Sequence, residues 1–185
     1  KVTAAAGIFT RDMMHDDDYS TAFFSESERF FHNRMNGVLA QYNGKRNSYV
    51  EFVCDWEGMY STLSREKFRI LLAGRHYLDT FYYGFNYSMF HYAGQQGAPI
   101  ENVVDLQLLN PCVGVRFNAF FDFDIKLGAL LTAQRDRSFG HSWEKPCMGE
   151  FAFRISRWGL SLDERLYVGD NIHPFFYGHE LEDGT

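Results

Sequence analysis

Hydrophobic and polar side chains alternate along residues 121–134. Because successive side chains of a β-strand point to opposite faces, this period of two predicts a strand with one apolar and one polar face. Such a strand is typical of a half-buried sheet or of a membrane-spanning β-barrel. The apolar face would carry Phe121, Phe123, Ile125, Leu127, Ala129, Leu131 and Ala133, and the other face Asp122, Asp124, Lys126, Gly128, Leu130, Thr132 and Gln134.

Most of the chain repeats this design, which predicts an all-β fold of about nine strands joined as an antiparallel up-and-down meander. The Asn43-Gly44 turn accepts the positive φ that a tight hairpin needs. A two-residue turn at 79–80 places Leu78 opposite Phe81, and both belong to the apolar face, as pairing across such a turn requires. The predicted strands are 2–10, 31–42, 48–60, 67–78, 81–91, 103–117, 121–134, 149–155 and 158–168.

The same alternation predicts two details of the register. The apolar positions change parity between Leu108 and Val113. Since proline cannot donate to the ladder, we expect a β-bulge at 110–111 that flips the faces. A turn at 156–157 would place Ile155 opposite Trp158, again with both on the apolar face.

The connections alternate in length, with short ones at 43–46, 79–80, 118–120 and 156–157 and longer ones at 11–29, 61–66, 93–102, 135–148 and beyond 169. In a meander, every short turn then lies at one end and every long loop at the other, which is the pattern of bacterial outer-membrane barrels. Nine is an odd number, whereas single-chain bacterial barrels have even numbers. We therefore expect residues 1–185 to form a single transmembrane β-barrel domain that is incomplete at one or both ends, or a small barrel with one strand miscounted.

The composition agrees with a chain that segregates residue types by strand face. Aromatic residues make up 18%, yet the mean hydropathy is -0.33 and the formal net charge is -6. No run approaches the roughly 20 apolar residues of a membrane helix, whereas a barrel strand needs only about 9–11 alternating residues. The acidic balance and the lack of a basic stripe argue against a nucleic-acid partner.

The polar faces carry too many charges of both signs for a dry core, where an unpaired ion would cost several kcal/mol. They either line a hydrated lumen with lipid outside, or face solvent around the aromatic core of a soluble, lipocalin-like ligand-binding barrel. The apolar face is almost uniformly large, whereas the interior of a small barrel mixes small and large residues, which favours the lumen. The predicted lumen-lining residues are Glu51, Asp55, Glu57, Arg69, Arg75, Asn86, Asp122, Asp124, Lys126, Arg154 and Arg165.

No arrangement of residues indicates catalysis, a metal site or a cofactor, and we expect none. The His-Asp cluster at 15–18 could bind a cation, although runs of Asp in loops are usually solvated. Ser88 with His91, and His141 with Ser142, could act as nucleophile and base, but neither pair has a surrounding motif. The charged rows of barrels commonly tune selectivity, so the row of Lys67, Arg69 and Arg75 could line a passage for anions.

Three cysteines, Cys54, Cys112 and Cys147, lack metal-ligand spacing. The simplest interpretation is that they are small buried or lipid-facing hydrophobic residues. A disulfide between Cys54 and Cys112 would require an oxidising compartment.

Four segments carry a resemblance to a known class: MNGVLAQY (35–42), SYVEFVCDW (48–56), SREKF (64–68) and LYVGD (166–170). Through them the chain resembles poorly characterised outer-membrane β-barrel proteins of the Bacteroidota type, over about residues 35–174. The resemblance implies a bacterial outer-membrane location and further strands on either side of this region. We expect a porin-like or transporter-like barrel in the lipid bilayer, or alternatively a structural or binding subunit that contacts other outer-membrane subunits through its long loops.

Overall fold

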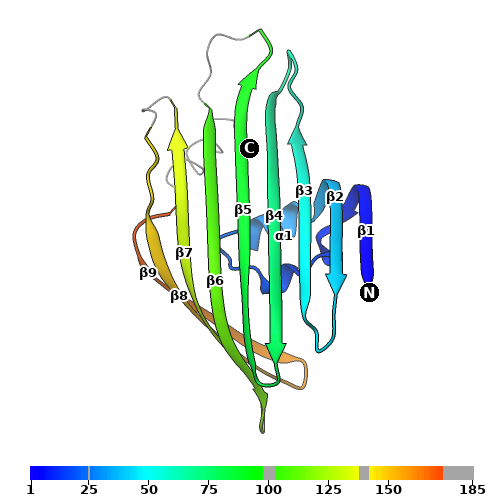
Figure 1. The fold of residues 1–185 in the computed structure, drawn as a ribbon, viewed down its shortest axis with the longest axis vertical. Coiled ribbons are helices and arrows are strands. Elements are labelled where there is room, and N and C mark those ends of the chain that lie inside the picture. The colour runs from blue at the N-terminus through cyan, green and yellow to red at the C-terminus, as the bar shows by residue number, and fades with distance from the viewer. Residues whose placement is uncertain (25, 98–102, 138–141, 173–185) are drawn as a thin grey trace.

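The structure is a computed structural model and describes residues 1–24, 26–97, 103–137 and 142–172. In these residues the chain forms one antiparallel sheet whose nine strands follow each other in chain order. This confirms the predicted all-β meander (Figure 1). The strands are β1 Val2–Thr10, β2 Arg34–Asn43, β3 Tyr49–Gly58, β4 Arg65–Leu78, β5 Phe81–Gln95, β6 Val104–Asn118, β7 Asp122–Asp136, β8 Cys147–Arg157 and β9 Leu160–Gly169.

The sheet is not closed, because within the described ranges β1 pairs only with β2 and β9 pairs only with β8. Strand direction alternates along the meander, so β1 and β9 run the same way. A direct pair between these two edges would therefore be parallel, unlike every other pair in the sheet. The turns 44–48, 79–80, 119–121 and 158–159 lie at the same end of the strands, at the bottom of Figure 1.

The two faces of the sheet differ as the alternation predicts. On β7, Lys126, Leu130 and Thr132 are buried on the concave face. The intervening positions point outward, and Leu127 is 57% exposed. Outward positions on other strands are also open: Phe81 of β5 is 64% exposed and Leu166 of β9 is 60% exposed. The convex face is therefore largely apolar and uncovered, whereas most of the charged residues of the sheet lie on the concave face.

The prediction of a loop at 11–29 and a strand from residue 31 is wrong. This stretch contains two 3-10 helices, η1 Arg11–Met13 and η2 Asp16–Asp18, and the helix α1 Glu26–Phe31. It lies across the concave face of the sheet (Figure 1). We call residues 11–31 the inner segment. Its aromatic residues form one hydrophobic cluster with inward residues of the sheet, including Tyr19, Phe23, Phe24, Met35, Leu39, Val53, Leu71, Leu108 and Leu130.

The expected bulge at 110–111 is also wrong. β6 keeps a continuous register with β5 through Asn110 and Pro111, and the same register with β7 on either side of them. The apolar positions change parity for another reason: Val104 and Leu106 face inward, where they form a second apolar cluster with Phe90 and Tyr92.

The last hairpin turns at Trp158-Gly159, two residues later than predicted. Arg157 pairs with Leu160, and Ile155 pairs with Leu162 rather than with Trp158. Trp158 and Gly159 both have positive φ, 53° and 78°, which is the geometry of a type I′ turn. Since the turn moved by an even number of residues, the faces of β8 and β9 remain as predicted. The Leu78–Phe81 pair forms as expected.

Candidate functional site: a charged interior covered by the inner segment

The predicted lumen-lining residues lie on the concave face of the sheet. Six of them are deeply buried: Glu51, Asp55, Arg69, Arg75, Asn86 and Lys126. Asp124 and Arg165 are half-buried, while Glu57, Asp122 and Arg154 are exposed. Because the sheet is open, a lumen stays a prediction, but the polar side chains share one surface. The inner segment, which the sequence did not place there, contacts three of the buried residues: Glu51, Arg69 and Arg75.

Glu51 on β3 joins the inner segment to the sheet. Its Oε1 accepts a hydrogen bond from the Tyr19 hydroxyl at 3.1 Å, and its Oε2 accepts one from the backbone N–H of His15 at 3.0 Å. Gln41 on β2 donates its amide to the same carboxylate and to the carbonyl of Met13 at 2.6 Å. Burial, followed by the nearby charge of Glu51, raises the pKa of Tyr19 well above its ordinary value. Tyr19 therefore stays protonated and remains a donor.

A second anchor is Glu28 of α1, whose carboxylate lies between two buried arginines. Its Oε1 is 3.1 Å from Nη2 of Arg11 and 2.7 Å from Nη1 of Arg69 on β4. Burial acts to raise the pKa of Glu28, but the charges and hydrogen bonds of the two arginines outweigh it, so the pKa lies below its ordinary value. Phe24, with no exposed surface, stacks under Arg11, whose Cζ lies 3.9 Å from the ring centroid.

The acidic cluster at 15–18 forms ion pairs. Asp16 pairs with Arg29 at 3.4 Å and Asp18 with Arg75 at 2.7 Å. Burial raises the pKa of Asp16, against the lowering effect of Arg29. The described part of the chain contains no group of three or more His, Cys, Asp or Glu side chains placed to hold a metal ion.

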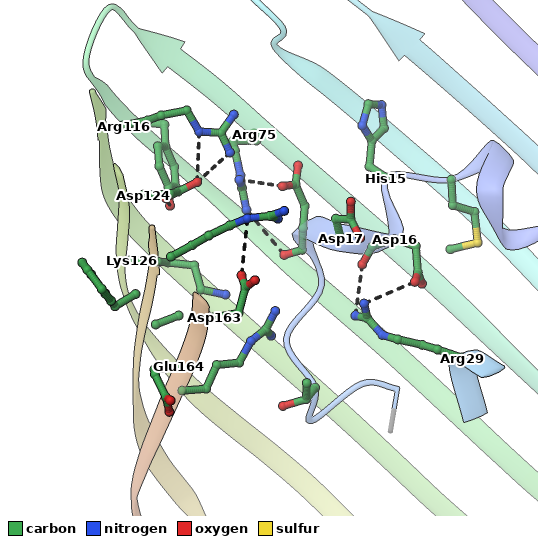
Figure 2. A pocket seen from close by; sticks show the side chains of 18 of the residues that line it. His15, Asp16, Asp17, Arg29, Arg75, Arg116, Asp124, Lys126, Asp163 and Glu164 are labelled. Carbon is green, nitrogen blue, oxygen red and sulfur yellow. Dashed lines mark hydrogen bonds and ion pairs between the residues drawn. The ribbon is translucent and has the colours of Figure 1, made fainter. Parts of the chain in front are cut away.

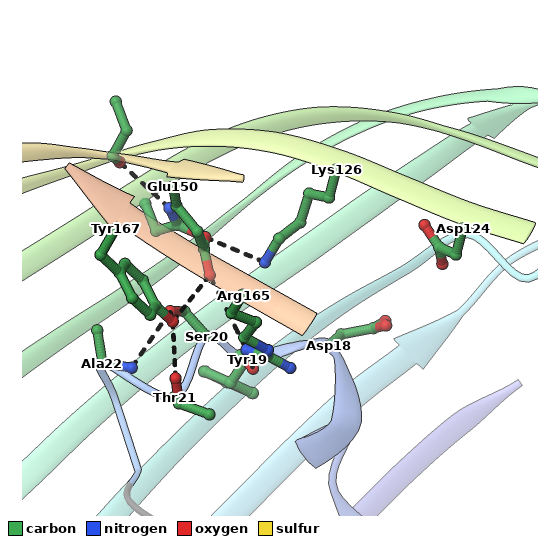
Figure 3. Close-up of polar contacts among 12 residues, drawn as sticks. Asp18, Tyr19, Ser20, Thr21, Ala22, Asp124, Lys126, Glu150, Arg165 and Tyr167 are labelled. Carbon is green, nitrogen blue, oxygen red and sulfur yellow. Dashed lines mark hydrogen bonds and ion pairs between the residues drawn. The ribbon is translucent and has the colours of Figure 1, made fainter. Parts of the chain in front are cut away.

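The inner segment also reaches β9, the edge strand opposite β1, as Figure 3 shows. The hydroxyls of Ser20 and Thr21 lie 2.9 Å and 2.7 Å from the hydroxyl of Tyr167 on β9. Tyr167 in turn donates to Oε1 of Glu150 at 3.2 Å, and Glu150 pairs with Lys126 at 3.2 Å. The segment thus bridges β2–β4 and β9, and it closes off the concave face between them.

Between the inner segment and β4–β9 remains a cavity of about 1120 Å³ (Figure 2). Its walls carry charges of both signs. Each basic side chain that lines it pairs with an acid: Arg29–Asp16, Arg75–Asp18, Arg116–Asp124, Lys126–Glu150, Arg154–Asp163 and Arg165–Glu150. The row expected to line an anion passage is neutralised as well, since Lys67 contacts Glu57 at 3.1 Å and Arg69 contacts Glu28. The basic groups of the interior are therefore neutralised, whereas Asp12, Asp17 and Glu164, which also line the cavity, form none of these pairs.

The candidate catalytic pairs are not assembled. Ser88 is buried on the concave face, whereas His91, three residues along the same strand, points outward and bonds Asp105 at 2.8 Å. His141 lies outside the described residues. The three cysteines are free. Cys54 and Cys112 occupy opposite faces of the sheet, which explains why they form no disulfide.

Sequence reasoning missed the residues that hold the inner segment, above all Tyr19, Phe24, Glu28, Gln41 and Glu150. One signal was available: large aromatic residues recur within an otherwise acidic stretch. A solvated loop has little use for Tyr19, Phe23 and Phe24, so their presence indicates a hidden apolar contact. Their partners on the sheet could not be identified from spacing.

The fold and the interior define a class of protein: an up-and-down antiparallel sheet with an apolar convex face and a charged concave face covered by a segment of its own chain. No known family profile matches the chain, and searches of curated proteins and of solved structures found nothing significantly similar. Among the described residues, no helix has the length and apolar character needed to cross a membrane.

Proposed function

We propose that this chain forms the wall of a porin-like or transporter-like β-barrel in the bacterial outer membrane. The observation that carries the proposal is the inverted distribution of residues: apolar side chains cover the convex face, and charged side chains fill the concave face. A soluble barrel encloses its apolar residues, so its outer surface is polar. Lipid is the solvent that suits this convex face.

The size of the apolar surface supports the same placement. Outward apolar residues run from Phe81 to Met89 on β5 and from Phe123 to Ala133 on β7. At about 3.3 Å per residue, these stretches are roughly 26–33 Å long. Strands tilted by about 40° would give a band of roughly 20–25 Å, close to the apolar band of about 25 Å in outer-membrane barrels.

The likeness of four sequence segments to outer-membrane proteins of the Bacteroidota type agrees with this compartment. On the proposed arrangement, the cavity of about 1120 Å³ is the part of the interior that solutes reach. Because its basic groups are all paired, the cavity suits small polar solutes rather than anions. The inner segment narrows the path to it.

A second function is favoured by how fully the inner segment covers the concave face. Tyr19 and Phe24 have no exposed surface, and Glu51 and Arg69 are buried beneath the segment. Such a filled interior would suit a structural or binding subunit of an outer-membrane assembly, which needs no open path. The two functions share the membrane placement and differ in conductance.

The first experiment tests the membrane placement. The protein should fractionate with outer membranes, require detergent, and migrate differently on gels with and without heating. Leu127→Arg puts a charge in the middle of the convex face and should cost about 2–4 kcal/mol of insertion free energy, so less protein reaches the membrane. Leu127→Ala is the matched control and should insert nearly normally. A chain that stays monomeric and soluble without detergent would sink the proposal.

The second experiment separates the two functions by conductance in planar bilayers. A transporter-like or porin-like wall predicts discrete conductance that increases when the inner segment is loosened by Phe24→Ala. If neither the wild type nor Phe24→Ala conducts, although both insert, the structural or binding function is the correct one.

A further inference from the structure

One row of side chains marks the end of the apolar band near the long connections. Residues that pair across five neighbouring strands, β3 to β7, form it: Trp56, Phe68, His91, Asp105 and Arg135. All lie on the convex face, outside the charged interior. The row begins with aromatic rings, Trp56 stacked on Phe68 at 5.6 Å and Phe68 against His91 at 5.1 Å. It ends in charges.

The charged end of the row is built around one carboxylate. Oδ2 of Asp105 accepts hydrogen bonds from Nη2 of Arg135 at 2.6 Å and from Nη2 of Arg137 at 3.1 Å. Its Oδ1 contacts Nδ1 of His91 at 2.8 Å. Asp105 therefore fixes two guanidinium groups side by side. Two arginines and one aspartate leave a positive charge at this site even when His91 is neutral.

The guanidinium groups retain donors for a further ligand. Each carries five N–H donors, and the shared Asp105 oxygen takes one from each. Nε of Arg135 is buried, so a ligand reaches this side chain, which is 19% exposed, through its terminal nitrogens. Trp143 stacks on Arg135, with the ring centroid 4.4 Å from Cζ, and keeps the group in place. Arg137 is 42% exposed and accessible from outside.

We propose that His91, Arg135 and Arg137 bind the phosphate of an anionic, phosphomonoester lipid headgroup. Paired guanidinium groups are the protein donors that match phosphate oxygens best. The site lies where the apolar band ends and aromatic residues begin, which is the depth of lipid headgroups beside a membrane barrel. The inference rests on the membrane placement proposed above, and it adds a specific lipid contact to that placement.

The test uses the purified full chain in zwitterionic detergent, titrated with phosphatidic acid or with phosphatidylcholine of the same acyl chains, and follows the heat-modifiable gel band. Phosphatidic acid should raise the transition temperature, and phosphatidylcholine should not. In R135Q/R137Q the apparent affinity for phosphatidic acid should fall at least tenfold. Arg46→Gln removes the same charge from an exposed turn at the opposite end and should change the affinity less than twofold.

Asp105→Asn gives a prediction of opposite sign. It removes the carboxylate that competes with the phosphate, so the affinity for phosphatidic acid should increase. A purely structural cluster would instead bind more weakly or not respond. The single substitution Arg137→Gln, at an exposed position, should weaken the binding of phosphatidic acid severalfold. It tests the same site if the double variant does not fold.

Three results would overturn the inference. They are unchanged phosphatidic acid affinity in the folded double variant, weaker binding by D105N, and equal stabilisation by inorganic phosphate, which would mean a site for free phosphate. Failure of the wild type to enter phosphatidylcholine nanodiscs would instead refute the membrane placement, so the two proposals fail separately.

Discussion

Truncating Phe24 should release the inner segment without unfolding the sheet. The Phe24 ring has no exposed surface and belongs to the cluster that joins the segment to the concave face. Removing a buried Phe side chain costs about 3–5 kcal/mol. The lost stacking with Arg11, at 3.9 Å, adds about 0.5–1 kcal/mol. At 1.4 kcal/mol for each factor of ten, the opening equilibrium of the segment should increase by roughly 300-fold to 10⁴-fold.

Hydrogen exchange measured by mass spectrometry in detergent micelles reports this opening directly. Peptides covering residues 11–31 of Phe24→Ala should exchange faster by that factor, up to the limit set by global unfolding. Peptides of β3 and β4 should keep their protection, because their backbone ladder does not pass through the segment.

Phe30→Ala is a matched control within the same segment. Phe30 is 79% exposed, so its truncation should change the free energy of opening of the segment by no more than about 0.5 kcal/mol. Equal exchange of the two variants, or a Phe24→Ala segment as protected as the wild type, would refute the placement of residues 11–31 against the sheet.

Three further predictions test other contacts. The pKa of Glu28 is lower in the folded protein than in the unfolded chain, so Glu28 stabilises the docked segment fully above the unfolded pKa and stops doing so as pH falls through the folded pKa. Hydrogen exchange of residues 11–31 should therefore accelerate below about pH 4 in the wild type, whereas Glu28→Gln should remove the pH dependence that comes from this site. Glu150→Gln leaves the buried Lys126 without its ion-pair partner and should lower the free energy of unfolding, measured with urea in micelles, by about 3–5 kcal/mol. The apolar double variant K126M/E150L should change that free energy little, and an equal loss in both variants would contradict the ion-pair argument. Gly159→Val forces a β-branched residue to φ near 78° and should destabilise the β8–β9 hairpin by about 1–2 kcal/mol, seen as faster exchange there, while unchanged exchange would contradict the turn.

The sequence alone determined the strands, their order and, except in the first half of β6, their faces. Alternation is a local signal, since each side chain of a strand points opposite to its neighbour whatever lies beyond it. Residues 121–134 therefore fold with the faces predicted for them, and the pair of Leu78 and Phe81 forms across its two-residue turn. The turn at 158–159 differs from the prediction by two residues, and this even shift leaves the faces unchanged.

Only the tertiary structure decided what covers the concave face. The inner segment joins residues that are far apart in the chain, such as Ser20 with Tyr167 and Tyr19 with Glu51. No periodicity encodes such a pair, because it depends on how the sheet curls and on the space left within it. The same reason explains Leu108 and Met35, which face inward among charges because the segment's aromatic rings meet them there. Local alternation fixed the two faces, and long-range packing determined which of them the chain itself would cover.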